Sequence, residues 1–220
     1  MSSDRCRVAC SSDWPPERNT TPGTAAGTVQ RKQRIVLSAT SRSDGWDFAP
    51  YPASKRAGEL LCYNYHHLYG LKVSCLRFFT VYGPAQRPEM AIHKFTDLLA
   101  RGEKVPMFGD GASRRDYTYV DDIIDGLVAA MDLAPGFEIL NLGGAETTAL
   151  KDLIHGLAAE LDVEPAIEYL PAQPGDVPIT YADVGKAGRL LGYSPKVPIR
   201  EGLRRFVAWY RQQQDGHHGS

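Results

Sequence analysis

The stretch YPASKRAGELLCYNYHHLYG, residues 51–70, followed by LKVSCLRFF, residues 71–79, decides the fold class of this chain. The first part predicts a helix, because apolar or small residues recur at spacings of three and four and Gly70 stands where a helix can end. The second part is a mostly apolar run, typical of a buried strand. A helix that leads into a buried strand is the repeating unit of doubly wound α/β sheets.

The helix expected from Tyr51 to Gly70 has one apolar stripe, which we expect to pack against the sheet. Its members, at spacings of three and four, are Ala53, Ala57, Leu60, Leu61, Asn64 and Leu68. A short apolar run at residues 35–38 predicts the strand before this helix. Downstream, the patterns predict helices at 92–100, 120–131, 150–161 and 199–210 and strands at 105–108 and 137–142. Thr148 is expected to cap the third of these helices.

Composition excludes several classes of partner. The chain has 25 basic and 26 acidic side chains in 220 residues, so no strong field favours nucleic acid or an anionic membrane. No apolar run reaches the roughly 18 residues of a membrane span, which makes the cytoplasm the expected compartment. The four cysteines lack paired C-x-x-C spacing, so we expect reduced thiols and no metal site.

Tyr51 and Lys55 are the first candidate catalytic pair. Residues four apart on a helix are neighbours on one face. A phenol has a pKa of about 10, so proton abstraction near neutral pH needs a shift of about three units, or roughly 4 kcal/mol. A nearby ammonium favours the phenolate and lowers the pKa. Because 11 tyrosines make such a spacing common by chance, its sequence context decides.

Several ordered motifs provide that context. The helix segment is followed by LRFFTVYGP at 76–84, RPEMAIHKF at 87–95, VPMFGDGASRRDYTYVDD at 105–122 and QPGDVPITYAD at 173–183. With these motifs, residues 50–212 resemble the extended short-chain dehydrogenase/reductase family of NAD-dependent epimerases and dehydratases, most of all its UDP-glucuronate 4-epimerases. The resemblance implies an α/β fold in which a partial Rossmann-type parallel sheet is joined to a smaller mixed α/β substrate-binding region.

The resemblance also implies a reaction, 4-epimerisation of UDP-glucuronate to UDP-galacturonate by transient oxidation at C4. Tyr51 would take the proton of the 4-hydroxyl as hydride passes to NAD. Lys55 would bind the nicotinamide ribose and lower the phenol pKa. Tyr51, Lys55 and Phe78 would be the cofactor-binding residues. The oxidised sugar must then turn over, so the site is expected to hold the nucleotide firmly and the sugar loosely.

The nucleotide-binding residues are assigned by their position in the motifs. Arg115 would bind phosphate, for which a planar guanidinium is well suited, although the Arg114–Arg115 pair also reads as a solvated basic turn. Phe108 and Met90 would contact the uridine, whereas on composition alone both are ordinary core residues. Asp176 would accept a hydrogen bond from the nucleotide ribose.

Two further residues favour a uronic acid as the sugar. Thr80 stands where many UDP-hexose epimerases have asparagine. Arg87 would face the sugar carboxylate, since a desolvated carboxylate needs a cationic or multiply donating partner. The alternative for Arg87 is a loop residue in water.

The chain departs from the family pattern at its N-terminal side. The G-x-x-G-x-x-G turn that approaches the cofactor pyrophosphate is absent from the sequence, and Gly185, Gly188 and Gly192 stand too near the C-terminus to replace it. Candidates for the third catalytic residue, a serine or threonine, are Ser38, Thr40 and Ser41. An inactive UDP-sugar-binding fragment therefore remains an alternative to the enzyme, as does a nucleotide-sugar dehydratase or decarboxylase.

These assignments divide the chain into four regions. Residues 1–34 are expected to be a disordered leader, and 35–85 a residual Rossmann-type part with the Tyr51 helix. Residues 86–212 would bind mainly the UDP-sugar while returning some Rossmann elements, and 213–220 would be a flexible tail. The expected partners are a UDP-sugar and a second copy of the chain, which the Tyr51 helix would contact, with no nucleic acid and no membrane.

Overall fold

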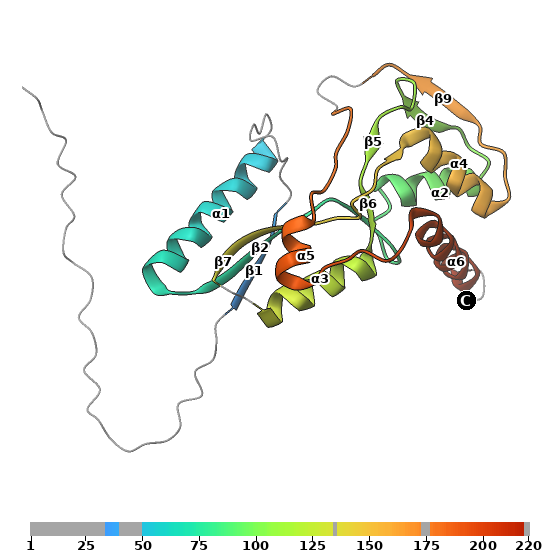
Figure 1. Cartoon of the computed structure of the whole chain (residues 1–220). Helices are drawn as coiled ribbons and strands as arrows, with labels where there is room; N and C mark the ends of the chain where they lie inside the picture. Colours follow the sequence, from blue (N-terminus) through green and yellow to red (C-terminus); the bar gives the residue numbers. More distant parts are fainter. Residues whose placement is uncertain (1–33, 40–49, 134–135, 173–176, 218–220) are drawn as a thin grey trace, which may run out of the picture. The chain divides into compact units, whose positions relative to one another are not determined.

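A computed structural model describes residues 34–39, 50–133, 136–172 and 177–217 (Figure 1). In chain order the elements are β1 (Arg34–Ala39), α1 (Pro50–Tyr69), β2 (Lys72–Phe78), β3 (Thr80–Tyr82), α2 (Ala91–Ala100), β4 (Val105–Phe108), β5 (Arg114–Arg115), β6 (Tyr117–Tyr119), α3 (Val120–Leu133), β7 (Phe137–Leu142), β8 (Thr148–Ala149), α4 (Leu150–Leu161), β9 (Ile167–Leu170), α5 (Gly185–Leu191) and α6 (Ile199–His217).

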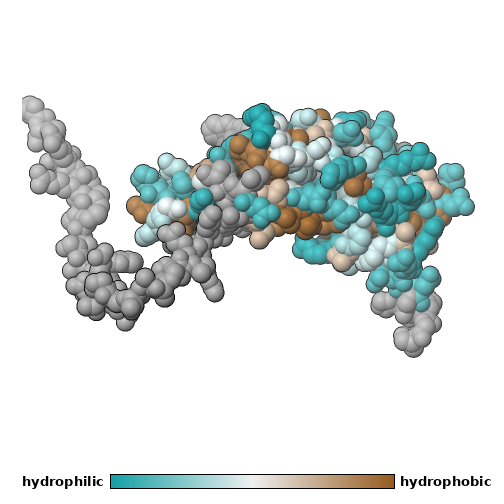
Figure 2. Space-filling model, turned by 60° about the horizontal axis from the view of Figure 1, so that its bottom comes forward, coloured by the Kyte–Doolittle hydropathy of each residue, from teal (hydrophilic) through white to brown (hydrophobic). Residues whose placement is uncertain are grey.

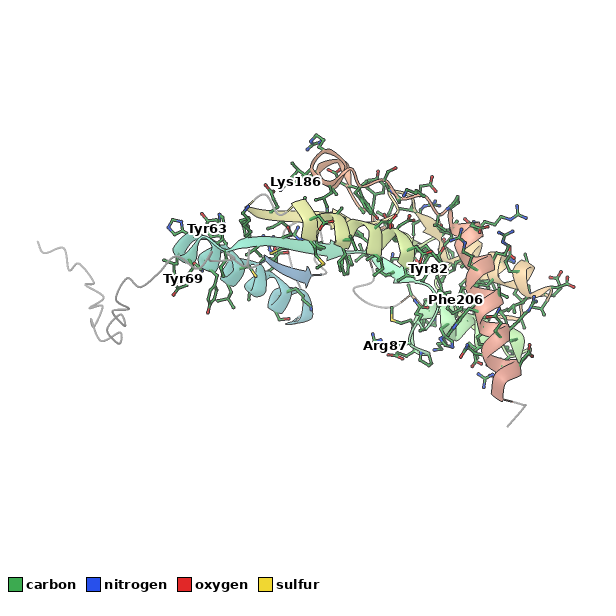
Figure 3. All side chains as sticks on the ribbon, turned by 90° about the horizontal axis from the view of Figure 1, so that it is seen from below. Tyr63, Tyr69, Tyr82, Arg87, Lys186 and Phe206 are labelled. Atoms are coloured by element: carbon green, nitrogen blue, oxygen red, sulfur yellow. The ribbon has the colours of Figure 1, made fainter. Side chains whose placement is uncertain are left out.

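Within the described residues, the main sheet has three parallel strands in the order β1-β2-β7. Parallel neighbours need crossover connections, and here helices provide them. Both α1 and α3 contact β1 and β2, from opposite faces of the sheet (Figures 1 and 3). Burial on both faces explains why the middle of β2 is apolar, with Val73, Cys75 and Leu76 fully buried. The expected α/β fold with a partial parallel sheet is confirmed.

The rest of the described chain forms a mixed α/β region from three small two-stranded sheets, β3-β6, β4-β9 and β5-β8, and the helices α2, α4 and α6. Its core is formed by α2, α4 and α6 together with β3, β4 and β6. The largest fully buried side chains in it are Tyr82, Phe206, Ile92, Leu153, Ile154 and Leu157. In this region, α4 packs against α2 and α6.

The prediction for the buried face of α1 was wrong. Leu60, Leu61 and Leu68 are 67%, 60% and 68% exposed, so the expected apolar stripe faces away from the sheet. Among the described side chains of α1, the buried one is Glu59, at 3% exposure. Its carboxylate accepts hydrogen bonds from Arg77 Nε at 2.7 Å and Nη2 at 2.8 Å. A guanidinium on β2 thus selects the face of α1 that meets the sheet, which helical periodicity alone does not show.

Apolar side chains are also exposed on α3, where Ile124, Val128 and Met131 follow one another at spacings of four and three. Figure 2 shows apolar patches among hydrophilic surface on the face that it presents. Exposed groups of this kind mark surfaces that contact another molecule or another segment of chain.

Two smaller predictions need correction. The N-cap of α4 is Ala149 rather than Thr148, because Thr148 is paired with Arg115 in the β5-β8 sheet. Helix α6 continues to His217, well into the segment expected to be a flexible tail. The three glycines near the C-terminus belong to α5 and its C-cap, where Gly192 has a φ of 68°. The expected leader, apart from Arg34 at the start of β1, lies outside the described residues.

Candidate functional site

Tyr51 and Lys55 lie in the first turns of α1, one turn apart. Since α1 connects two parallel strands, its N-terminus lies at the edge where the strands end, and this carboxyl edge is where open α/β sheets bind ligands. Lys55 is half-buried there. The side chain of Tyr51 is not among those described, and of the serine and threonine candidates only the backbone of Ser38, within β1, is described.

Phe78 and Thr80 lie at the same edge. Phe78 is the last residue of β2 and packs on the core cluster formed by β2, β7, α3 and α5. Thr80 begins β3, and its backbone N–H donates to the carbonyl oxygen of Asp116 at 3.1 Å. The fold therefore brings the chain that leaves β2 against the strand that follows Arg115.

A pocket of about 300 Å³ lies beside β4 and the segment that begins at Val177. Its lining residues are Phe108, Gly109, Asp110, Ala112, Ser113, Ala172, Val177 and Pro178. Arg115 borders it, because Nη1 of Arg115 donates to the carbonyl oxygen of Val177 at 2.6 Å. Of the predicted substrate residues, Phe108 thus lines this pocket, and Arg115 is bonded to one of its lining residues. Asp176 directly precedes Val177 but lies outside the described residues.

Arg87 and Met90 lie on the loop between β3 and α2, where Arg87 Nη2 contacts Met90 Sδ at 3.8 Å. The Arg87 side chain is 75% exposed, forms an ion pair with Glu89 at 3.2 Å and projects from the ribbon in Figure 3. Gln86 fixes the loop: its side-chain amide donates to the carbonyl of Val81, and its side-chain oxygen accepts from the His93 backbone N–H. An exposed guanidinium on a fixed loop is available to an anionic ligand.

Asp116 was not predicted as a site residue. Its carboxylate is 0% exposed and accepts four hydrogen bonds, from the backbone N–H groups of Gly144 (2.7 Å), Ala145 (3.1 Å) and Ala182 (3.2 Å) and from Thr118 Oγ1 (3.0 Å). Burial raises the pKa of the Asp116 carboxyl, and the hydrogen bonds from Gly144, Thr118, Ala182 and Ala145 oppose that shift. In the sequence, the local sign of a role for Asp116 was its position next to two arginines. The backbone groups that donate to its carboxylate are distant in sequence.

Two glycines at the end of β7 make this arrangement possible. A Cβ on Gly143 would collide with the Cβ of Ala182, and one on Gly144 would lie 3.1 Å from Asp116 Oδ1. The Gly143–Gly144 pair therefore allows the chain after β7 to approach the carboxylate closely.

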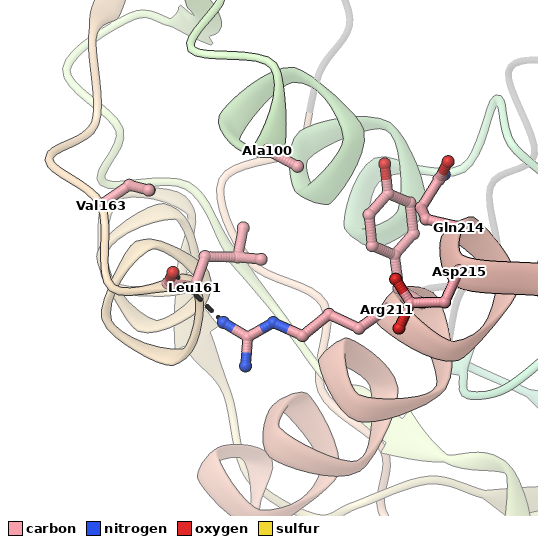
Figure 4. A pocket seen from close by; sticks show the side chains of 7 residues that line it. Ala100, Leu161, Val163, Arg211, Gln214 and Asp215 are labelled. Carbon is pink, nitrogen blue, oxygen red and sulfur yellow. Dashed lines mark hydrogen bonds between the residues drawn. The ribbon is translucent and has the colours of Figure 1, made fainter. Parts of the chain in front are cut away.

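A second pocket, of about 350 Å³, lies where the ends of α2 and α4 meet α6 (Figure 4). Its lining residues are Ala100, Leu161, Val163, Tyr210, Arg211, Gln214 and Asp215. The guanidinium of Arg211 donates to the carbonyl oxygens of Glu160 and Leu161, each at 3.2 Å, and so caps the C-terminus of α4. None of the predicted site residues lines this pocket, whereas Phe108 lines the first one, which we therefore take as the candidate site.

The described ranges contain no group of three or more histidine, cysteine or acidic side chains arranged to hold a metal ion. Within the same ranges, no helix combines the length and hydropathy that crossing a membrane requires.

Comparison with known proteins gives consistent results. The chain is 43% identical over 165 residues to the UDP-glucuronate 4-epimerase of Thermodesulfobacterium geofontis, covering 74% of this chain and 51% of that protein. It is 42% identical over 183 residues to an uncharacterised protein of Methanocaldococcus jannaschii, covering 83% of this chain and 56% of that protein. The chain thus spans little more than half the length of these relatives.

Among solved structures, UDP-glucuronic acid 4-epimerase from Bacillus cereus, in complex with UDP-glucuronic acid and NAD, superposes with a TM-score of 0.74 at 34% identity. The match covers 82% of this chain and 62% of that one. The dTDP-glucose 4,6-dehydratase DesIV from Streptomyces venezuelae, with NAD and TYD bound, gives a TM-score of 0.76 at 30% identity. The sequence profile of the NAD dependent epimerase/dehydratase family matches residues 26–143, more than half of the chain, and the chain belongs to that family.

Proposed function

We propose that this chain binds a UDP-sugar and provides the proton-transfer residues for its NAD-dependent 4-epimerisation, with UDP-glucuronate and UDP-galacturonate as the interconverted pair. The observation that supports this best is a pocket lined by Phe108 and bordered by Arg115, which bonds to the lining residue Val177, as expected for contacts to a uridine and a diphosphate. Membership of the family supports the reaction class, and the relatives named as UDP-glucuronate 4-epimerases support the sugar.

The residues present fit the nicotinamide end of NAD. Tyr51, Lys55 and Phe78 lie at the carboxyl edge of the sheet, where they would hold the nicotinamide and its ribose. The G-x-x-G-x-x-G turn that usually binds the pyrophosphate is not found in these 220 residues. When bound, NAD would accept and return the hydride at C4 of the sugar.

The chain's own residues would provide binding and proton transfer. Arg115 would hold the diphosphate through paired N–H donors, so that the nucleotide stays fixed while the sugar turns. Tyr51, as phenolate, would accept the proton of the 4-hydroxyl and, after the sugar has turned, give it back to the 4-oxygen. The charge on Lys55 would favour that phenolate.

Arg87 provides the test of the sugar. We expect wild type to bind UDP-glucuronate more tightly than UDP-glucose in calorimetric titration. Replacing Arg87 by alanine should weaken UDP-glucuronate binding by about tenfold or more, the effect of losing a hydrogen bond to a charged group, and leave UDP-glucose unchanged. Lys94→Ala, which removes an exposed charge from α2, is the matched control and should change neither affinity. Equal UDP-glucuronate affinity in Arg87→Ala and wild type would remove the reason for choosing a uronic acid.

Calorimetric titration with NAD distinguishes an enzyme from a UDP-sugar-binding protein without catalytic activity. Micromolar NAD binding would support catalysis, and analysis of the sugar product would then distinguish epimerisation from dehydration or decarboxylation. Binding of UDP-sugar without NAD would favour a UDP-sugar-binding protein with no catalytic role. The dehydratase alternative is kept because DesIV superposes as well as the epimerases do.

We also propose that α1 contacts a second copy of the chain. Its exposed face presents Leu60, Leu61, Tyr65, Leu68 and Tyr69, a larger apolar surface than single exposed side chains provide. Leu61→Glu should therefore shift a dimer to monomer in sedimentation velocity, because it places a charge in the contact. Tyr169→Glu, at an equally exposed position on β9, should leave the sedimentation coefficient unchanged. A monomeric wild type at all concentrations would refute this contact.

A further inference from the structure

Residues 177–182 form a strap along β5 that borders the candidate pocket. At one end, the carbonyl of Val177 accepts from Arg115 Nη1 at 2.6 Å. In the middle, Arg114 exchanges backbone hydrogen bonds with Pro178 and Thr180, at 2.8 Å and 3.0 Å. At the other end, the N–H of Ala182 donates to Asp116 Oδ2 at 3.2 Å. Three consecutive residues, Arg114 to Asp116, thus hold the whole strap.

The three attachments differ in what holds them. The middle pair is a backbone interaction that survives any side-chain change. The Arg115 attachment uses a side chain on which the proposed diphosphate contact also depends. The Asp116 attachment is buried, so the carboxylate is held to one geometry by its four donors.

Asp116 also joins the strap to the main sheet. The same carboxylate accepts from Gly144 and Ala145, which follow β7, and the backbone carbonyl of Asp116 accepts from Thr80, which follows β2. One residue therefore fixes the carboxyl edge of the sheet, the strap and the strand that presents Arg115. Ala145 is held here at a φ of 55°, a left-handed conformation that is uncommon for alanine and needs a compensating contact.

We propose that Asp116 is a positioning residue for the nucleotide diphosphate: by fastening the strap to the carboxyl edge of the sheet, it sets the place of the Arg115 guanidinium and of the pocket wall at Val177 and Pro178. This proposal rests on the proposed function, because it takes the pocket at Phe108 as the UDP site. Asp116 acts through these groups and makes no contact with the nucleotide itself.

A buried aspartate elsewhere in the same fold provides a matched control. Asp122 is 3% exposed, and its carboxylate accepts from the backbone N–H groups of Lys196 at 2.9 Å and Val197 at 3.1 Å. It ties a distant segment to the fold just as Asp116 does, but that segment leads into α6 and does not border the pocket. Asparagine at either position keeps the size of the side chain and replaces one accepting oxygen by a donor that faces backbone N–H groups.

The experiment is calorimetric titration of the full chain with UDP, at a temperature where circular dichroism shows each variant folded. Asp116→Asn should weaken UDP binding by about tenfold to a hundredfold, the effect of a small misplacement of binding groups. Asp122→Asn should lower the unfolding midpoint about as much as Asp116→Asn does. It should nevertheless leave UDP affinity within about twofold of wild type. An Asp116→Asn variant that binds UDP as wild type does would show that Asp116 only stabilises the fold.

A second measurement does not depend on a variant that folds. In wild type, UDP should slow hydrogen exchange at the amides of Arg114, Thr180 and Ala182, because the strap borders the occupied pocket. No change at these amides on saturation with UDP would overturn the proposal even if Asp116→Asn fails to fold. If wild type binds no UDP at all, the proposed function fails, and with it this inference; if only the variant and exchange results fail, the proposed function stands.

Discussion

Replacement of Glu59 by leucine is expected to lower the free energy of unfolding by about 3–5 kcal/mol. The Glu59 carboxylate is 3% exposed and bonded to both Nε and Nη2 of Arg77, whose side chain is 12% exposed. Leucine fills most of the same volume but removes the carboxylate that balances the buried guanidinium, and a desolvated charge of this kind is costly. Urea unfolding monitored by circular dichroism would measure the loss.

Two controls separate this charge effect from a packing effect. Arg56, 49% exposed, also contacts Glu59, at 3.3 Å, and Arg56→Ala should cost less than about 1 kcal/mol, as surface ion pairs do. The double variant Glu59→Leu/Arg77→Met removes both charges and should recover most of the lost stability, since apolar replacements of buried pairs are often neutral. If the double variant is less stable than Glu59→Leu alone, the carboxylate is not what balances Arg77.

Replacement of Tyr51 by phenylalanine is expected to reduce the rate of epimerisation by about 10²–10⁴-fold, the usual contribution of a positioned acid–base group. Phenylalanine keeps the ring and removes only the hydroxyl that exchanges the proton with the sugar. The affinity for UDP should not change, because the nucleotide contacts come from other elements. The measurement is the turnover of UDP-glucuronate with added NAD, with the sugar products separated chromatographically.

Tyr63 on the same helix provides the control. It is 51% exposed and stacks on His67, away from the N-terminal turn, so Tyr63→Phe should keep wild-type turnover. If Tyr51→Phe turns over at more than about a tenth of the wild-type rate, Tyr51 is not the acid–base group. An active wild type is a precondition, and the calorimetric test with NAD addresses that separately.

The sequence was sufficient for most of the elements but not for the orientation of α1. Periodicity placed the strands β2 and β7 and the helices α2, α3 and α4 within a few residues, because each buries a continuous apolar face. On α1 the same rule selected Leu60, Leu61 and Leu68, which are exposed. The deciding contact joins Glu59 to Arg77, 18 residues away, and a charged residue gives no sign in sequence that it will be buried.

The candidate site was predictable in part for a similar reason. Phe108 and Arg115 came from a single motif, and in the structure Phe108 lines the candidate pocket while Arg115 bonds to Val177 at its border. Asp116 stands in that same motif but was given no role, because the groups that define it, Gly144 and Ala182, are 28 and 66 residues away. Local motifs identify groups that contact ligands, whereas a residue that joins distant segments is found only when those segments are seen together.

The order of strands in the main sheet affects how the chain folds as it is synthesised. β2 lies between β1 and β7, yet β7 is synthesised only after α2, α3 and all of the strands β3 to β6. Until then one edge of β2 is without its native neighbour, and contacts of such long sequence separation form slowly. One hydrogen-bond donor to the Asp116 carboxylate, the N–H of Ala182, is synthesised later still. During translation the nascent chain thus exposes an unpaired strand edge, a feature that favours aggregation.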